Sequence, residues 1–265
     1  MTTFQTIASG SGGNAALLTA GDTRILLDMG ISCRKLCAAL ARAGTGPAEL
    51  DAVFISHEHS DHIAGLATYI KKYSTPIFTT PGTARQLAYR LAGVEELLRP
   101  VPMGETADVG ACEVTLLPTS HDCRESAAFR VDTPDGAVGL LTDTGFIPER
   151  TGKGLLGVEL LVLESNHDVE TLRSGPYPLS LKRRVLGEFG HLSNDEAAAY
   201  AAACARAGTQ RILLAHLSRE NNTPRMALNA VGRMLEAAGF QGELAVAERD
   251  TPGRVFVLER VRCGG

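Results

Sequence analysis

The sequence predicts an α/β protein in which two β-sheets pack face to face with helices on the outside. Along its 265 residues, short apolar runs typical of strands come first, then helical and strand-like segments alternate, and this order occurs twice. The chain has no linker, low-complexity segment or obvious repeat, and its 44% hydrophobic and 21% charged residues are ordinary for a globular protein. We therefore expect residues 1–265 to form a single domain.

The first half of the chain opens with strands. Apolar and β-branched runs predict three of them, joined by a Ser/Gly-rich loop at 9–14 and a Gly21-Asp22 turn, at residues 4–9, 14–20 and 23–29. The next predicted elements are a helix, a buried strand, a helix, a short strand and a helix that Pro81 opens, over residues 33–43, 51–56, 63–73, 76–79 and 82–92.

The second half repeats this order. Strands are predicted at 112–119, 127–132 and 137–142, with the last two joined as a hairpin by Thr133-Pro-Asp-Gly136. Ser193 and Glu196 form a capping box for a helix that ends near Ala207. The other elements are a strand, a helix, a buried strand, a helix and two short closing strands, over residues 160–163, 179–189, 211–215, 224–238, 244–247 and 255–258.

The densest cluster of potential metal ligands in the sequence is the stretch His57-Glu58-His59-Ser60-Asp61-His62. It places three histidines and an aspartate between the predicted strand 51–56 and the predicted helix 63–73, where several side chains can converge on one point. Imidazole nitrogens and carboxylate oxygens bind zinc, manganese and iron. Four such side chains within six residues predict a metal site.

The pattern His57-x-His59-x-Asp61-His62 resembles the signature of the metallo-β-lactamase superfamily. The resemblance implies a four-layer αβ/βα sandwich of two mixed sheets, with a two-metal site at one edge. Other residues match further motifs of the superfamily, each at the end of a predicted strand: Asp28, His121, Asp143 and His216.

The resemblance also implies a ligand set for two divalent metal ions. The first ion would be held by histidines alone, the second by two histidines and an aspartate, and a further aspartate would bridge them: His57, His59 and His121; Asp61, His62 and His216; and Asp143. Each ion would keep an open position, and the pair would activate a hydroxide. The ligand types accept zinc, manganese or iron. Two divalent ions outweigh two carboxylates, so the centre favours an anionic substrate such as a phosphodiester.

Longer strings indicate a branch of the superfamily. Gly190-His191-Leu-Ser-Asn194 and the strand ending at His216 resemble the tRNA 3′-processing ribonucleases, in which a histidine placed like His191 protonates the leaving oxygen. The alternative for His191 is a helix-entry histidine bonded to backbone. The whole chain resembles the YycJ/WalJ family of bacterial metallo-β-lactamase-fold proteins, through the strings at residues 9–14, 164–168, 190–194 and 215–222.

The YycJ/WalJ resemblance implies a metal-dependent phosphodiester hydrolase: a 5′→3′ DNA exonuclease linked to DNA repair, with DNA as substrate and His191, Asp61 and Asp143 as catalytic residues. One alternative, hydrolysis of a small ester or cyclic phosphodiester, would use the same catalytic residues. A second alternative, a regulatory module that has lost catalysis, is disfavoured by the complete ligand set. The intervals 121–143 and 143–216 are too short for the tRNA-binding arm or the β-CASP insertion of other branches. We expect neither of these additions.

Several further residues are candidates to support the ligands or contact the substrate. By resemblance, Asp28 fixes the orientation of a ligand. The loop from Ser9 to Asn14 either lets its amides approach a phosphate or is only a permissive turn. His167 either supports His191 and the substrate or is structural. The remaining candidates lie on the solvated surface or contact phosphates, and they are Arg219, Asn222 and the run Lys182-Arg-Arg184.

Composition and charge bear on the partners and the cellular compartment that we expect for the protein. A net charge of −4 argues against a broad basic face for nucleic acid, although a local groove remains open. No segment approaches the ~20 apolar residues of a membrane span, and the first residues lack the features of a signal peptide, so we expect a cytoplasmic protein with no membrane partner. The six cysteines show no disulfide framework and are expected to be reduced. The sequence does not determine the oligomeric state.

Overall fold

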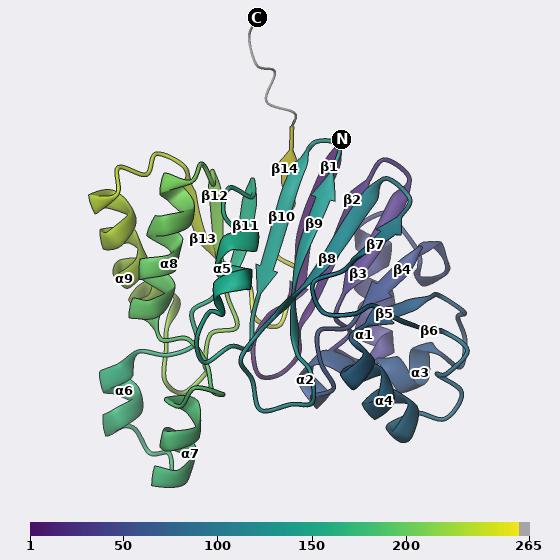
Figure 1. Ribbon diagram of the computed structural model, residues 1–265, viewed down its shortest axis with the longest axis horizontal. Helices are drawn as coiled ribbons and strands as arrows, with labels where there is room; N and C mark the ends of the chain where they lie inside the picture. Colours follow the sequence, from purple (N-terminus) through teal and green to yellow (C-terminus); the bar gives the residue numbers. More distant parts are fainter. Residues whose placement is uncertain (260–265) are drawn as a thin grey trace, which may run out of the picture.

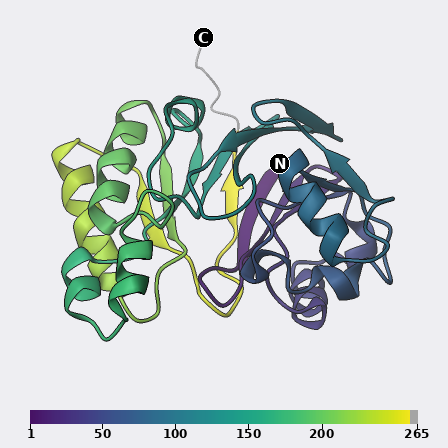
Figure 2. The same cartoon turned by 60° about the horizontal axis from the view of Figure 1, so that its bottom comes forward.

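In the computed structural model, which describes residues 1–259, two sheets lie face to face and helices cover their outer sides (Figure 1). Figure 2, turned so that the lower end of Figure 1 comes forward, shows the helices at both flanks and the sheets between them. The predicted fold class, two mixed sheets with flanking helices, is therefore confirmed.

The first sheet combines antiparallel and parallel pairing. It is antiparallel from β14 to β3 and parallel from β3 to β6. Its strands, in spatial order, are β14 (Phe256–Leu258), β1 (Thr2–Ala8), β2 (Ala15–Ala20), β3 (Thr23–Leu27), β4 (Ala52–Phe54), β5 (Ile77–Thr79) and β6 (Leu98–Pro100).

The second sheet follows the same plan. It is parallel from β13 to β10 and antiparallel from β10 to β7. Its strands, in spatial order, are β13 (Glu243–Val246), β12 (Arg211–Ala215), β11 (Leu160–Glu164), β10 (Gly136–Leu141), β9 (Ala127–Thr133), β8 (Cys112–Pro118) and β7 (Thr106–Val109). The predicted hairpin is β9–β10, closed by the pair Thr133 and Gly136.

The helices divide between the two outer faces. Buried residues of α1 (Cys33–Arg42), α3 (Leu66–Tyr69) and α4 (Pro81–Arg90) pack on the first sheet. Those of α8 (Asn194–Arg206) and α9 (Pro224–Ala237) pack on the second. The remaining helices are η1 (Pro47–Glu49), α2 (Ser60–Ile63), α5 (Glu149–Gly154), α6 (Val169–Ser174) and α7 (Leu179–Val185).

The central core lies between the sheets and follows the two-residue alternation of the strands. In β4, Ala52 and Phe54 face the opposite sheet, whereas Val53 faces the helices. Across the core, the rings of Phe54 and Phe129 are 5.9 Å apart and meet edge to face. Because both faces of the central strands are buried, they read as continuous apolar runs in the sequence.

The carboxyl ends of six strands lie at one end of the molecule. In the first sheet β3 and β4 are parallel to each other, in the second β10, β11 and β12 are parallel to one another, and β8 has the direction of β10. Binding sites of α/β proteins gather at such an edge. The loops that leave these strands carry the residues singled out in the sequence.

The helix predicted over residues 63–73 is wrong. Two short helices, α2 and α3, replace it, and the break falls at Gly65. The Asn14 amide donates a hydrogen bond to the Asp61 carbonyl at 2.8 Å. The Gly65 amide donates to the Met29 carbonyl at 3.0 Å instead of to that Asp61 carbonyl. A Cβ at Gly65 would lie 2.3 Å from the carbonyl oxygen of Ile31, so this close packing requires glycine.

The helix predicted over 179–189 is also too long, since α7 ends at Val185. The chain then turns back, and the amide of His191 donates to the Val185 carbonyl at 3.1 Å. Five elements lacked a clear pattern and were not predicted: η1, β6, β7, α5 and α6. The capping box of Ser193 and Glu196 is confirmed at the start of α8.

Five of the six cysteines are free thiols, and Cys263 lies outside the described residues. Among residues 1–259, no helix has the length and apolar character needed to cross a bilayer.

Candidate metal centre

Three polar residues just beyond the ends of strands have an unusual backbone conformation. Asp28, Asp143 and His216 have φ values of 60°, 57° and 55°, and they are the only described non-glycine residues with positive φ. This conformation costs a non-glycine residue about 1–2 kcal/mol. Backbone hydrogen bonds hold two of them, from the Asp28 amide to Phe54 and from the His216 amide to the Ser9 hydroxyl. Such strain is typical of functional sites.

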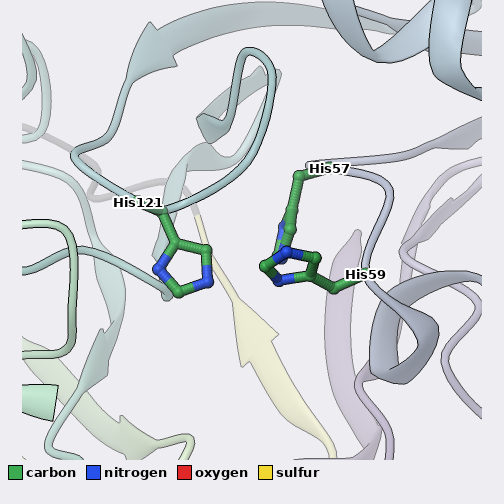
Figure 3. A group of neighbouring side chains, drawn as sticks. All are labelled: His57, His59 and His121. Carbon is green, nitrogen blue, oxygen red and sulfur yellow. The ribbon is translucent and has the colours of Figure 1, made fainter. Parts of the chain in front are cut away.

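Three imidazoles form what we call the first group: His57, His59 and His121. The ring of His57 is 4.6 Å from that of His59 and 5.1 Å from that of His121, and the His59 and His121 rings are also 5.1 Å apart. Figure 3 shows the three rings turned toward one another. Two of the histidines come from the loop after β4 and the third from the loop after β8, so two sheets contribute to one cluster.

Two imidazoles and two carboxylates form the second group: Asp61, His62, Asp143 and His216. The Asp61 Oδ2 atom lies 3.6 Å from the Nε2 atoms of both His62 and His216. The His62 Nε2 atom lies 3.1 Å from Asp143 Oδ2. Within each group the potential ligand atoms lie within 4.8 Å of one another, close enough to share one ion.

Asp143 lies between the two groups. One carboxylate oxygen, Oδ1, is 3.7 Å from His121 Nε2, and the other, Oδ2, is 3.1 Å from His62 Nε2. The side chain is almost completely buried. Its position suits a carboxylate that contacts both groups at once.

The hydrogen bonds of the histidines leave the same nitrogen facing the centre. The Nδ1 atoms of His57, His62, His121 and His216 lie beside Ser56 Oγ, Asp28, the Gly190 carbonyl and Glu164, at 3.0, 2.8, 3.1 and 2.9 Å. A proton on Nδ1 leaves the Nε2 lone pair for a metal ion. Asp28 also accepts hydrogen bonds from the Ser56 amide and hydroxyl, at 2.8 and 2.9 Å.

Unpartnered buried atoms test whether these residues fit a metal. His57 Nε2, His216 Nε2 and Asp143 Oδ2 are buried without any hydrogen-bond partner. Each such atom costs about 1–3 kcal/mol if nothing satisfies it. Nitrogen and oxygen donors that converge from three directions match the preferences of divalent transition metals. The donor set therefore fits divalent cations.

Glu164 is the functional residue that sequence reasoning missed. It ends β11 and is fully buried. One oxygen, Oε1, is 2.8 Å from His191 Nδ1 and 2.9 Å from His216 Nδ1, and the other accepts from the amides of Thr144 and Leu192 at 3.0 and 3.3 Å. The available signal was a carboxylate closing an otherwise apolar buried strand, because a buried charge requires partners.

Glu164 and His191 form a buried ion pair beside the metal groups. Burial alone would raise the pKa of Glu164, but the two histidines outweigh it and lower that pKa to about 2. Burial alone would lower the pKa of His191, but the nearby carboxylates of Glu164 and Asp143 raise it. The side chain of His191 remains 20% exposed, so its ring can reach a bound molecule. His191 thus holds a proton more readily than a free imidazole, and its ring lies next to the centre.

The loop at residues 9–14 contacts the second group. The Asn14 Nδ2 atom lies 3.1 Å from His62 Nε2 and 3.3 Å from the Asp61 carbonyl oxygen. The Asn14 Oδ1 atom accepts from the Gly10 amide at 2.9 Å. Together with the contact of Ser9 to the His216 amide, these bonds hold two predicted ligands in place, so the loop does more than turn the chain.

The other sequence candidates lie around the centre at greater distance. Asn222 is buried, and its amide donates to Ser165 and Asn194 at 2.8 Å. Arg219 is exposed and pairs with Asp250 at 3.4 Å. His167 is buried, and neither of its ring nitrogens has a hydrogen-bond partner. None of the three belongs to a ligand group of the described chain, and their contacts to substrate stay predictions.

A cavity of about 140 Å³ opens beside His191. Apolar and aromatic side chains of the α7 region form one wall, and these include Tyr177, Leu181 and Phe189. Ser11, from the loop at 9–14, lines the cavity as well. Arg184 reaches its rim and donates to Asp122 at 2.5 Å, so this member of the Lys182-Arg-Arg184 run faces the site.

Comparison with known proteins agrees with this geometry. Residues 23–217 match the family described as the Beta-lactamase superfamily domain. The chain belongs to the metallo-β-lactamase superfamily and is a metal-dependent hydrolase of that fold.

Similarity to curated proteins shows the branch of the superfamily to which the chain belongs. The chain is 34% identical to exodeoxyribonuclease YycJ of Bacillus anthracis, over 89% of this chain and 90% of that protein. It is also 34% identical to exodeoxyribonuclease WalJ of Streptococcus pneumoniae, over 88% of each. The chain is thus a member of the YycJ/WalJ family. Among solved structures, the metallo-β-lactamase fold protein YhfI of Bacillus subtilis superposes with a TM-score of 0.72 at 20% identity, over 97% of this chain and 100% of that chain.

Proposed function

We propose that this protein is a metal-dependent phosphodiesterase that removes nucleotides from the 5′ ends of DNA. The observation that carries the proposal is the Glu164–His191 pair beside two convergent ligand groups, which provides a proton donor next to a centre suited to cations. The DNA substrate rests on the similarity to YycJ and WalJ, which are named exodeoxyribonucleases, and the 5′ polarity is what the family resemblance of the sequence implies. From the family resemblance of the sequence we also propose a cytoplasmic role in DNA repair, carried by one domain without a β-CASP insertion or tRNA-binding arm.

In this proposal two divalent ions occupy the centre. The first group would hold one, the second group the other, and Asp143 would contact both. When bound, such ions neutralise phosphate charge and lower the pKa of water so that it can attack at neutral pH. Asp28 and Glu164 fix the rings of His62 and His216 from behind, which keeps each Nε2 atom directed at the centre.

His191 acts on the leaving group. A sugar oxygen that departs from phosphorus needs a proton near neutral pH, and the charged imidazole of His191 supplies it. Glu164 is a positioning residue, because it holds the Nδ1 side of the ring and raises the pKa of His191. The cavity next to His191 then receives the departing nucleotide, whose base can rest against Tyr177 and Phe189.

The decisive experiment offers the metal-reconstituted protein a panel of substrates. The panel contains end-labelled duplex DNA, single-stranded DNA, RNA and bis-p-nitrophenyl phosphate, each with zinc, manganese or iron. We expect release of labelled mononucleotides from 5′-labelled DNA. Robust turnover of a thioester or lactone, with none of any phosphodiester, would reject the proposal. Hydrolysis of bis-p-nitrophenyl phosphate alone would keep the phosphodiesterase chemistry and reject DNA as substrate.

A further inference from the structure

A second cavity, of about 240 Å³, lies on the other side of the loop at residues 9–14. One wall is a face of α1, the second is Gly12 and Gly13, and the third is the segment 249–252 that precedes β14. None of its lining residues belongs to the ligand groups described above. The cavity is therefore a separate feature next to the metal centre.

Three cations surround this cavity: Lys35, Arg42 and Arg249. Within residues 1–259, none of them forms an ion pair with a carboxylate. The single acidic residue in the lining, Asp250, is paired with Arg219. In a chain whose net charge is −4, this local excess of unpaired positive charge is unusual and favours an anionic ligand.

The walls between the cations are made of small residues. Lys35 and Arg42 lie two turns apart on α1, and Ala38 and Ala39 occupy the turn between them. At Gly12 an added Cβ would meet nothing within 4 Å, and its φ is not positive, so neither packing nor backbone conformation demands glycine there. The small residues leave the space between the three cations free of bulky side chains.

The loop connects this cavity to the metal centre. Its Ser11 lines the cavity beside His191, while the next residues, Gly12 and Gly13, line the cationic cavity. Asn14 contacts the second group directly. Arg249 also links the two sides, since its guanidinium lies 3.5 Å from the carbonyl oxygen of Ser218, which lines the first cavity.

We propose that the cationic cavity binds the phosphates of the retained strand. The argument rests on the proposed nuclease function: because His191 protonates the leaving oxygen, the departing nucleotide lies on its side of the centre. The strand that remains must then leave the centre by another route. The route across residues 11–13 leads to Lys35, Arg42 and Arg249, which contact consecutive backbone phosphates without reading the bases.

The test removes the three charges while keeping a polar, unbranched side chain at each position. The variant Lys35→Gln/Arg42→Gln/Arg249→Gln is compared with Lys153→Gln/Arg206→Gln/Arg233→Gln, which loses the same charge from α5, α8 and α9. The ligand is a fluorescent single-stranded oligodeoxynucleotide whose phosphorothioate linkages resist cleavage. Affinity is measured over a range of salt concentrations, and hydrolysis of bis-p-nitrophenyl phosphate reports on the metal centre.

We expect the cavity variant alone to lose affinity, by about tenfold or more at low salt. The slope of its plot of log affinity against log salt concentration should become shallower by up to about two. Each neutralised phosphate contributes about 0.7 to that slope for a single strand. Turnover of bis-p-nitrophenyl phosphate should be unchanged, since this small ester does not reach the cavity.

A second pair of variants guards against a general charge effect or a folding defect. Ala38→Glu places a carboxylate inside the cavity on an exposed helical position, and Ala199→Glu makes the same change on the exposed side of α8. Only Ala38→Glu should weaken DNA binding, with both melting temperatures unchanged. Equal affinities and salt slopes for cavity and control variants, in a protein that cleaves DNA, would overturn this proposal alone. A wild-type protein that cleaves no DNA would instead overturn the proposed function.

Discussion

The two ligand groups of the centre differ in how they arrange charge. The first group contains three imidazoles and no carboxylate. The second contains two carboxylates, and two more stand behind its histidines, Asp28 behind His62 and Glu164 behind His216. The same residue type therefore meets opposite electrostatic surroundings a few ångströms apart.

The pKa values of the histidines diverge as a result. Burial lowers the pKa of His57 and His121, and the neighbouring imidazoles reinforce the decrease. Burial acts in the same direction on His62 and His216, but Asp143 and the carboxylates behind the rings outweigh it and raise both values, that of His216 to about 10. His57 and His121 thus hold protons less readily than a free imidazole, whereas protons compete more strongly with a metal ion at His62 and His216.

The largest effect should follow from removing the residue that the two groups share. Asp143→Ala takes away the carboxylate near both His62 and His121, so both ions should be held weakly and hydrolysis should become undetectable. Metal analysis after gel filtration and a bis-p-nitrophenyl phosphate assay measure the two outcomes. Asp132→Ala, which only disturbs a pair with Arg130, is the control. Full activity with two ions still bound would remove Asp143 from its bridging position.

The next largest effect concerns the proton donor attached to the second group. His191→Ala should leave both ions bound, because His191 belongs to neither ligand group, but slow DNA cleavage by about 10²–10⁴-fold. The loss should shrink for bis-p-nitrophenyl phosphate, since p-nitrophenolate leaves without a proton. Single-turnover rates on both substrates make the comparison. Equal slowing of the two substrates would mean that His191 has only a structural role.

A companion variant separates positioning from proton transfer. Glu164→Gln removes the charge that raises the pKa of His191, so that pKa should fall. Because the protonated ring is the active form, the rate declines as pH rises through this pKa, and the alkaline limb of the pH–rate profile should move to lower pH. A profile of unchanged shape would show that Glu164 does not set the protonation of His191.

A smaller effect should distinguish the metal affinities of the two ligand groups. Asp28→Asn keeps the side-chain shape, and asparagine tolerates the positive φ at this position. Losing the carboxylate behind His62 should weaken the ion of the second group by about 10–100-fold and leave the first unchanged. Chelator competition that resolves two ions tests this. Equal weakening of both ions would contradict the assignment of separate groups.

The smallest effect is a difference in pH dependence between the groups. Protons compete with the metal at His62 and His216, whose pKa values are raised, and much less at His57 and His121, whose values are lowered. As pH falls from about 8 to about 5, the second group should therefore lose its ion first. The metal content of protein dialysed at successive pH values shows whether one ion leaves before the other. Simultaneous loss of both would refute the difference in charge.

The sequence by itself determined the parts of the protein that depend on local order. The six residues from His57 to His62 follow one strand directly, so their chemistry was visible as a string. The strands ending near Asp28, Asp143 and His216 were visible as apolar runs, because both of their faces are buried. The capping box of α8 and the β9–β10 hairpin are likewise local, since neighbouring residues satisfy their hydrogen bonds.

Only the tertiary structure decided the features that depend on contacts across the chain. Helix 63–73 broke at Gly65 because distant backbone took its hydrogen bonds, from Asn14 and to Met29. Glu164 gained its role because β11 lies beside β12, which brings His216 and then His191 to one carboxylate. The cationic cavity likewise combines Lys35 with Arg249, which no sequence pattern connects. Periodicity and propensity report which way a side chain faces, but partners far apart in sequence meet only when the sheets pack.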